Sequence, residues 1–88
     1  MKENLEEKLA KYRSLTKLAL EKVEIRKEYG KKLLEMAKAY YEDAQYFEKK
    51  GLKLTALAAY SYAHAWIDAG VRIGLLDGKN DDNLFVLP

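Results

Sequence analysis

Hydrophobic residues recur at helical spacing along most of the chain. Residues 3–27 carry mostly apolar side chains at alternating intervals of four and three: Leu5, Leu9, Tyr12, Thr16, Ala19 and Val23. Residues 31–50 repeat the pattern with Leu33, Ala37, Tyr40, Ala44 and Phe47. This spacing places one apolar stripe on one face of a helix. The sequence therefore predicts two amphipathic helices, the first ending near Gly30 and the second at Gly51.

Residues 53–76 form a third segment that is apolar on most of its sides. Its small residues fall on two lines by helical angle, Ala56, Ala59, Ala63, Gly70 and Gly74 on one and Ala58, Ala65 and Ala69 on the other. We expect the first line to face another helix at close range. The polar residues share one narrow sector: Ser61, His64, Asp68 and Arg72. The apolar girth of this helix exceeds what two neighbouring helices cover.

These segments predict one all-α domain over residues 1–88, an up-down-up three-helix bundle with a tail at 77–88. The apolar run 84–87 is expected to pack back on the bundle. Leu18 and Ile25 lie opposite the main seam of the first helix and suggest a second contact surface. We therefore predict a symmetric homodimer, with the tail and a second subunit together covering the third helix.

Composition narrows the possible partners and the chemistry. The chain has 88 residues, no cysteine and a net charge of +2. Its lysines alternate with glutamates, which argues against a nucleic-acid partner. Asp68 and Arg72 argue against membrane insertion of the third segment. The N-terminus lacks a signal-peptide core, which predicts a cytoplasmic protein. One histidine without cysteines predicts neither a metal site nor a cofactor.

The candidate chemistry lies on the polar sector of the third helix. His64, Asp68 and Arg72 follow one another at intervals of four, with Ser61 one turn earlier. Asp68 can orient His64 as a general base while Arg72 holds an anion. The structural alternative is an i, i+4 pair of Asp68 and Arg72 on a solvent-facing stripe, with His64 hydrogen-bonded to a neighbour. On the second helix, Asp43 is expected to accept a hydrogen bond from Arg72 or a tyrosine hydroxyl.

Two stretches carry a family resemblance. Residues 40–51 read YYEDAQYFEKKG, and residues 56–76 read ALAAYSYAHAWIDAGVRIGLL. Both resemble an archaeal family of short helical proteins catalogued as domain of unknown function 357. Leu52 departs from the family pattern, which tends to place an acidic capping residue there. The resemblance implies a compact helical fold and an archaeal, cytoplasmic source, and it implies no activity.

Three functions follow as hypotheses for this uncharacterised helical protein. The first is a protein-binding or scaffolding module with an unidentified protein partner, and not an enzyme. The alternative is a small-molecule or enzymatic site along the stripe of His64, Asp68 and Arg72. The third is an RNA-associated accessory protein. A concave pocket around the polar sector distinguishes the second hypothesis from the first.

Overall fold

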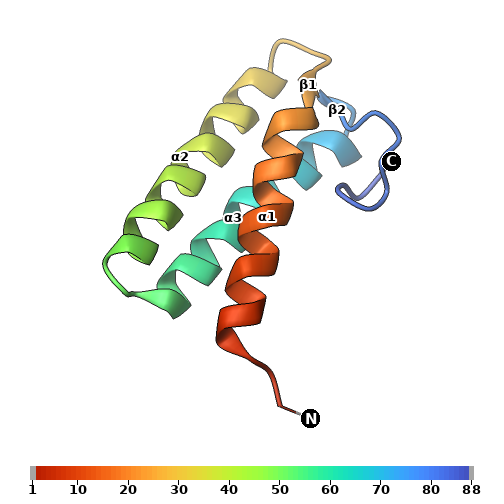
Figure 1. The fold of residues 1–88 in the computed structure, drawn as a ribbon. Helices are drawn as coiled ribbons and strands as arrows, with labels where there is room; N and C mark the ends of the chain where they lie inside the picture. The colour runs from red at the N-terminus through yellow and green to blue at the C-terminus, as the bar shows by residue number, and fades with distance from the viewer. Residues whose placement is uncertain (1, 88) are drawn as a thin grey trace.

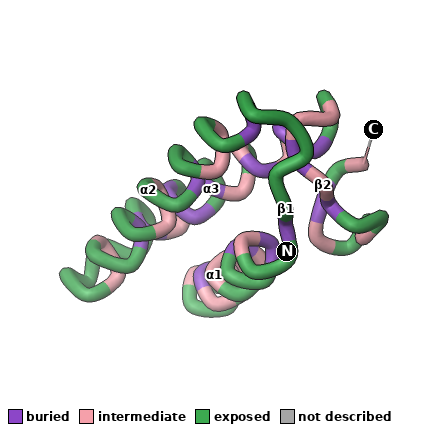
Figure 2. Tube along the Cα trace, turned by 90° about the horizontal axis from the view of Figure 1, so that it is seen from above, coloured by how far each residue is buried: buried purple, intermediate pink, exposed green. Residues whose placement is uncertain are grey.

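The computed structural model describes residues 2–87 and consists of three long helices joined by short connections. In chain order the elements are α1 (Leu5–Lys22), β1 (Glu24–Ile25), α2 (Gly30–Lys49), α3 (Lys53–Arg72) and β2 (Leu76–Asp77). Helices α2 and α3 form an antiparallel hairpin, and α1 packs against α3 while it barely contacts α2 (Figures 1 and 2). The predicted all-α three-helix bundle is confirmed, with α3 as its central helix.

Helix α1 is shorter than the predicted 3–27. It begins after Asn4, whose side-chain Oδ1 accepts a hydrogen bond from the Glu7 amide at 3.1 Å, a typical N-cap. It ends at Lys22 because Val23 is extended, with ψ at 141°. The following residues form β1, which pairs antiparallel with β2 so that Ile25 lies opposite Leu76. The prediction that one helical line joins Leu18 to Ile25 is therefore wrong.

Two glycines end the other helices in the same way. Gly51 and Gly74 have φ of +78° and +79°, in the left-handed region that glycine adopts without strain. The amide after each bonds five residues back, Leu52 to Phe47 at 3.0 Å and Leu75 to Gly70 at 2.9 Å. These are Schellman caps. The second cap ends α3 at Arg72, four residues before the predicted end at position 76.

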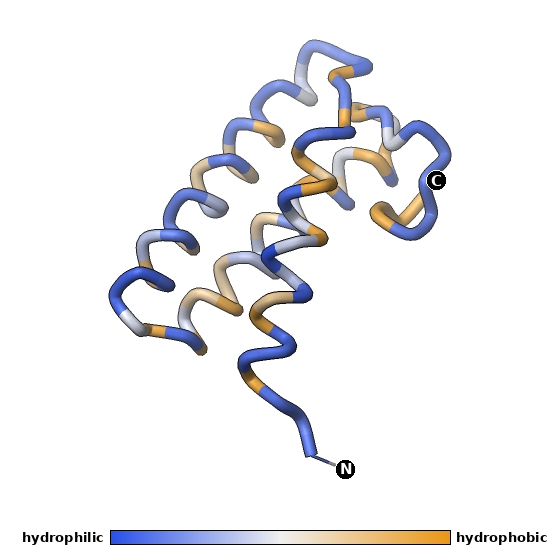
Figure 3. The backbone as a smooth tube through the Cα atoms, viewed as in Figure 1, coloured by the Kyte–Doolittle hydropathy of each residue, from blue (hydrophilic) through white to orange (hydrophobic). Residues whose placement is uncertain are grey.

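The core consists of two clusters along α3. One holds seven buried apolar residues near the β1–β2 pair: Ala19, Val23, Ala37, Ile67, Val71, Leu76 and Phe85. The other lies toward the α2–α3 turn and holds Leu9, Ala44, Ala56, Ala59 and Tyr60. Ala63 is fully buried, as expected for the small-residue line. Helix α3 is the most hydrophobic of the three in Figure 3, whereas α1 and α2 are mostly hydrophilic.

The C-terminal tail packs back on the bundle, as predicted. Phe85 is only 3% exposed and belongs to the cluster near β2, and Leu84 and Leu87 pack against the same cluster. Gly78 lets the Phe85 ring approach the chain, because a Cβ there would lie 2.8 Å from a ring carbon. The tail therefore covers one side of α3 beside α1 (Figure 1).

Candidate functional site

The polar residues of α3 hold the backbone of the tail. His64 Nε2 lies 2.6 Å from the Leu84 carbonyl oxygen, and Asp68 Oδ1 accepts a hydrogen bond from the Val86 amide at 3.1 Å. The His64 and Asp68 side chains are 14% and 28% exposed. The two side chains thus bind one carbonyl and one amide of an irregular segment that has no secondary structure to satisfy them.

This geometry fixes the proton on the histidine. The Leu84 carbonyl oxygen only accepts hydrogen bonds, so Nε2 of His64 is protonated and donates. Asp68 Oδ1 lies 3.6 Å from the same nitrogen. A general-base pair instead uses one nitrogen for the carboxylate and the other for the substrate proton. The docked tail therefore gives His64 a donor role at Nε2, and Nε2 is not free to accept a proton.

The other two polar residues of this helix are also engaged. Arg72 Nη1 donates to the Leu87 carbonyl oxygen at 2.6 Å. Ser61 Oγ donates to the Leu57 carbonyl oxygen one turn earlier, at 3.0 Å, which is the local bond that serine makes within helices. The four polar side chains lie on one sector of α3, as their spacing predicted. As in the structural alternative, Arg72 is exposed and His64 is hydrogen-bonded to a neighbouring segment. No Asp68–Arg72 ion pair is found among the described residues, because Arg72 donates to Leu87 and Asp68 accepts from Val86.

Asp43 does not make the predicted contact. It is exposed on α2, and none of the hydrogen bonds or ion pairs found within residues 2–87 involves it. The donors expected for Asp43 bond to other groups. Arg72 turns to the tail, and the hydroxyl of Tyr60 donates to Glu48.

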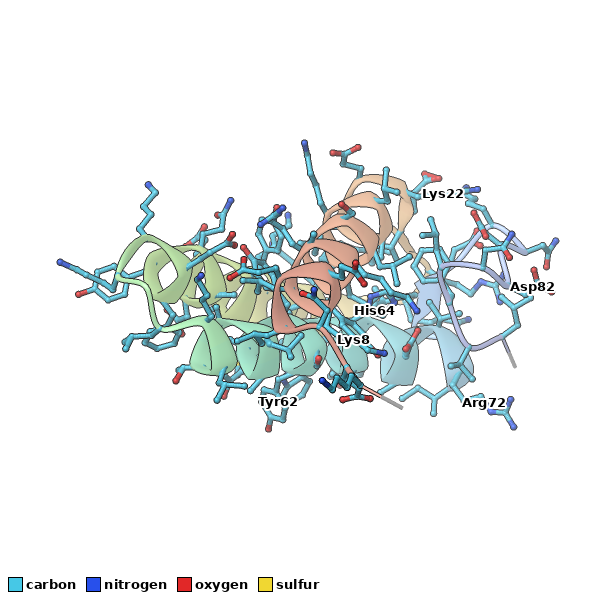
Figure 4. All side chains as sticks on the ribbon, turned by 60° about the horizontal axis from the view of Figure 1, so that its bottom comes forward. Lys8, Lys22, Tyr62, His64, Arg72 and Asp82 are labelled. Atoms are coloured by element: carbon cyan, nitrogen blue, oxygen red, sulfur yellow. The ribbon has the colours of Figure 1, made fainter. Side chains whose placement is uncertain are left out.

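A hollow of about 300 Å³ lies between α1, α3 and the tail. Its lining includes Tyr12 and Leu15 from α1, Ser61, His64 and Asp68 from α3, and Asp82, Asn83 and Phe85 from the tail. Figure 4 shows His64 between α1 and the tail segment that carries Asp82. Of the polar residues of α3 that line the hollow, His64 and Asp68 hold the tail and Ser61 bonds within the helix. Within the described residues no three His, Asp or Glu side chains are placed to share a metal ion.

A second polar cluster joins all three helices and was not found from the sequence. The Tyr60 hydroxyl on α3 donates to Glu48 Oε1 on α2 at 2.8 Å, and Arg13 on α1 forms an ion pair with the same carboxylate. Burial, and then the hydrogen bond to Glu48, raise the pKa of Tyr60 well above its ordinary value of 10.0. These residues are far apart in sequence, so no local pattern links them.

The remaining side of α3 is uncovered. Six apolar residues line it, and we call them the apolar stripe: Leu54, Ala58, Tyr62, Ala65, Ala69 and Ile73. All six are exposed, with Leu54 72%, Tyr62 49% and Ile73 65% exposed. In Figure 4, Tyr62 and Arg72 project from the side of α3 opposite to α1. The sequence pattern placed Ala58, Ala65 and Ala69 on one line of the helix. It did not show that Leu54, Tyr62 and Ile73 belong to the same exposed face.

Aromatic side chains border the apolar stripe. The Tyr62 ring meets Tyr40 of α2 edge to face with centroids 4.5 Å apart, and it meets Trp66 with centroids 6.0 Å apart. The contact with α2 restricts Tyr62, which is half exposed. Large aromatic residues held in this way are common at protein interfaces, because little conformational entropy is lost when they bind.

The fold and these surfaces define a small all-α protein with a self-docked tail and one open helix face. None of the helices in the described part of the chain is long and apolar enough to cross a membrane. The family model for DUF357, a protein of unknown function, matches residues 3–76. The chain therefore belongs to the DUF357 family, and the family resemblance seen in the sequence is confirmed. No curated protein and no solved structure matches the chain.

Proposed function

We propose that this protein is a protein-binding module that acts through the apolar stripe of α3. The observation that carries this proposal is that six consecutive stripe positions are apolar and exposed over residues 54–73. A helix of that length extends about 28 Å at ~1.5 Å per residue. An extended apolar helix face that carries a single charge, Arg72, and lies beside aromatic rings is the pattern of helix-mediated recognition.

The small-molecule or enzymatic alternative is less well supported by the geometry. A ligand in the hollow next to His64 meets a histidine and a carboxylate that already bind the tail backbone. A ligand that bonds the same His64 and Asp68 atoms requires the tail to move away first. The RNA-associated role and the cytoplasmic location stay predictions from the sequence.

A capture experiment with matched variants tests the binding proposal. The immobilised protein is compared with the double variant Leu54→Lys/Ile73→Lys, using extract of the cells from which the protein comes. Lysines on the stripe introduce charges that must be desolvated on binding. We expect specifically captured proteins, including the chain itself, to be lost with this variant.

The control places the same change elsewhere. Leu18→Lys alters a residue of α1 that is 49% exposed and lies outside the stripe. This variant should capture the same proteins as the unmodified chain. Circular dichroism melts must show that all variants remain folded. Identical capture by the stripe variant and the unmodified chain contradicts the proposal.

A further inference from the structure

We propose that the partner covering the apolar stripe is a second copy of this chain. The two α3 helices pack antiparallel about a two-fold axis at the level between residues 63 and 64. This inference rests on the proposed function, because it names the occupant of the same surface. It is carried by the order and spacing of the stripe residues, by their exposed area, and by the position of the neighbouring charge.

The spacing of the stripe is the same in both directions. Its six residues are separated by four, four, three, four and four positions. A two-fold axis at the midpoint therefore exchanges Leu54 with Ile73, Ala58 with Ala69, and Tyr62 with Ala65. A two-fold contact requires this self-complementarity, because the same patch serves both copies.

The residue sizes also fit antiparallel pairing. At the centre each Tyr62 ring lies against the small Ala65 of the other copy. On either side Ala58 meets Ala69, which lets the helix axes approach to the lower end of the usual ~8–10 Å separation. At the ends Leu54 packs against Ile73. Parallel pairing instead sets Tyr62 against Tyr62, and these two rings hold the helix axes apart, which leaves gaps where alanine meets alanine.

Charge favours the antiparallel direction as well. Arg72 is the one charged residue that shares the angular sector of the stripe by its position on α3. Parallel helices bring the two Arg72 side chains together. Antiparallel helices separate them by about 25 Å along the axis, beyond the ~8–10 Å over which charges act in physiological salt. Antiparallel helix dipoles also attract each other.

The available area indicates a weak, reversible dimer. Leu54 and Ile73 are about two-thirds exposed, Tyr62 is half exposed, and the three alanines are exposed. With ~100 Å² for an aliphatic side chain and ~200 Å² for tyrosine, the stripe offers roughly 300–400 Å² per copy. Two copies with their flanking residues approach the ~1,000 Å² that a specific interface needs.

Disulfide trapping tests both the partner and the direction. The chain has no cysteine, so introduced thiols are the only ones present. The variants Ala58→Cys and Ala69→Cys are oxidised separately and then as a mixture. In an antiparallel dimer, the two thiols of either variant alone are about 16 Å apart along the axis, which is too far for a disulfide. In the mixed dimer one thiol of each variant lies opposite the other.

We expect a covalent heterodimer in the mixture and only background in the separate samples, as seen by mass spectrometry without reductant. Leu18→Cys mixed with Ala69→Cys gives the background from random collisions. Efficient disulfides in the separate samples mean parallel helices and overturn the proposal. No disulfide above background, with a monomeric mass by light scattering at about 100 μM, also overturns it.

These outcomes separate the inference from the proposed function. If the chain is monomeric and its captured proteins are lost with Leu54→Lys/Ile73→Lys, the stripe binds a different protein. The binding function then stands, and the second copy is refuted. A monomeric chain whose capture is unaffected by those substitutions refutes both.

Discussion

Phe85 is expected to contribute more to stability than any other residue of the tail. Its ring is 3% exposed and joins the core cluster that contains Ile67 and Val71. Burying ~150–250 Å² at about 25 cal/mol per Å² corresponds to roughly 4–6 kcal/mol. Phe85→Ala should therefore destabilise the protein by about 3–5 kcal/mol, the usual cost for a buried phenylalanine.

The measurement is a thermal and urea melt followed by circular dichroism and by the fluorescence of Trp66, which packs against the same cluster. For a domain of this size each kcal/mol shifts Tm by about 4–8 °C, so the loss should be at least ~12 °C. The control is Val86→Ala, at a neighbour that is 54% exposed, with an expected change within about 0.5 kcal/mol. A loss below ~1 kcal/mol for Phe85→Ala would show that the tail detaches while the bundle stays intact, and would refute this reasoning.

Three further substitutions test the interior. Ala63→Leu, at a fully buried position, should destabilise by ~1–3 kcal/mol in urea through overpacking, and an unchanged midpoint would place the small-residue line in solvent. Gly30→Ala puts a Cβ into the Leu75 carbonyl oxygen, so a similar or larger loss is expected, and no loss would mean that this junction shifts freely. The pKa of Tyr60 is raised by burial and by Glu48, so the unfolded chain ionises first and stability falls as pH rises above 10.0. Tyr60→Phe should flatten that alkaline decline, and parallel pH curves for the two proteins would contradict the assignment.

The end of a helix was predictable where a local signal sets it. For α2 the predicted span 31–50 differs by one residue at each end from Gly30–Lys49, because Gly51 provides a local stop. The end of α1 was missed because it depends on pairing between β1 and β2, which are about fifty residues apart. The apolar run beyond Gly74 obscured the cap that ends α3.

The candidate site was predictable as a set of residues but not as an arrangement. The spacing placed His64, Asp68 and Arg72 on one sector, and the apolar run at 84–87 predicted a returning tail. Nothing local indicates that this tail lies along that sector, since the path depends on the turn after Gly78. The expectation for Asp43 also failed, because the hairpin places Tyr41 beside Tyr60 and Gly30 beside Leu75, so Arg72 lies toward the opposite end of the hairpin from Asp43.

The distribution of polar groups around α3 explains why the binding surface is assigned to its apolar side. A returning segment without secondary structure exposes amides and carbonyls, and these need partners when they are packed against a helix. His64, Asp68 and Arg72 supply those partners. They are therefore used within the chain, although charged residues are the usual first candidates for function. In the apolar stripe Tyr62 packs against Tyr40 and Trp66, but all six side chains stay exposed, so the stripe is the surface of α3 that a partner can still cover.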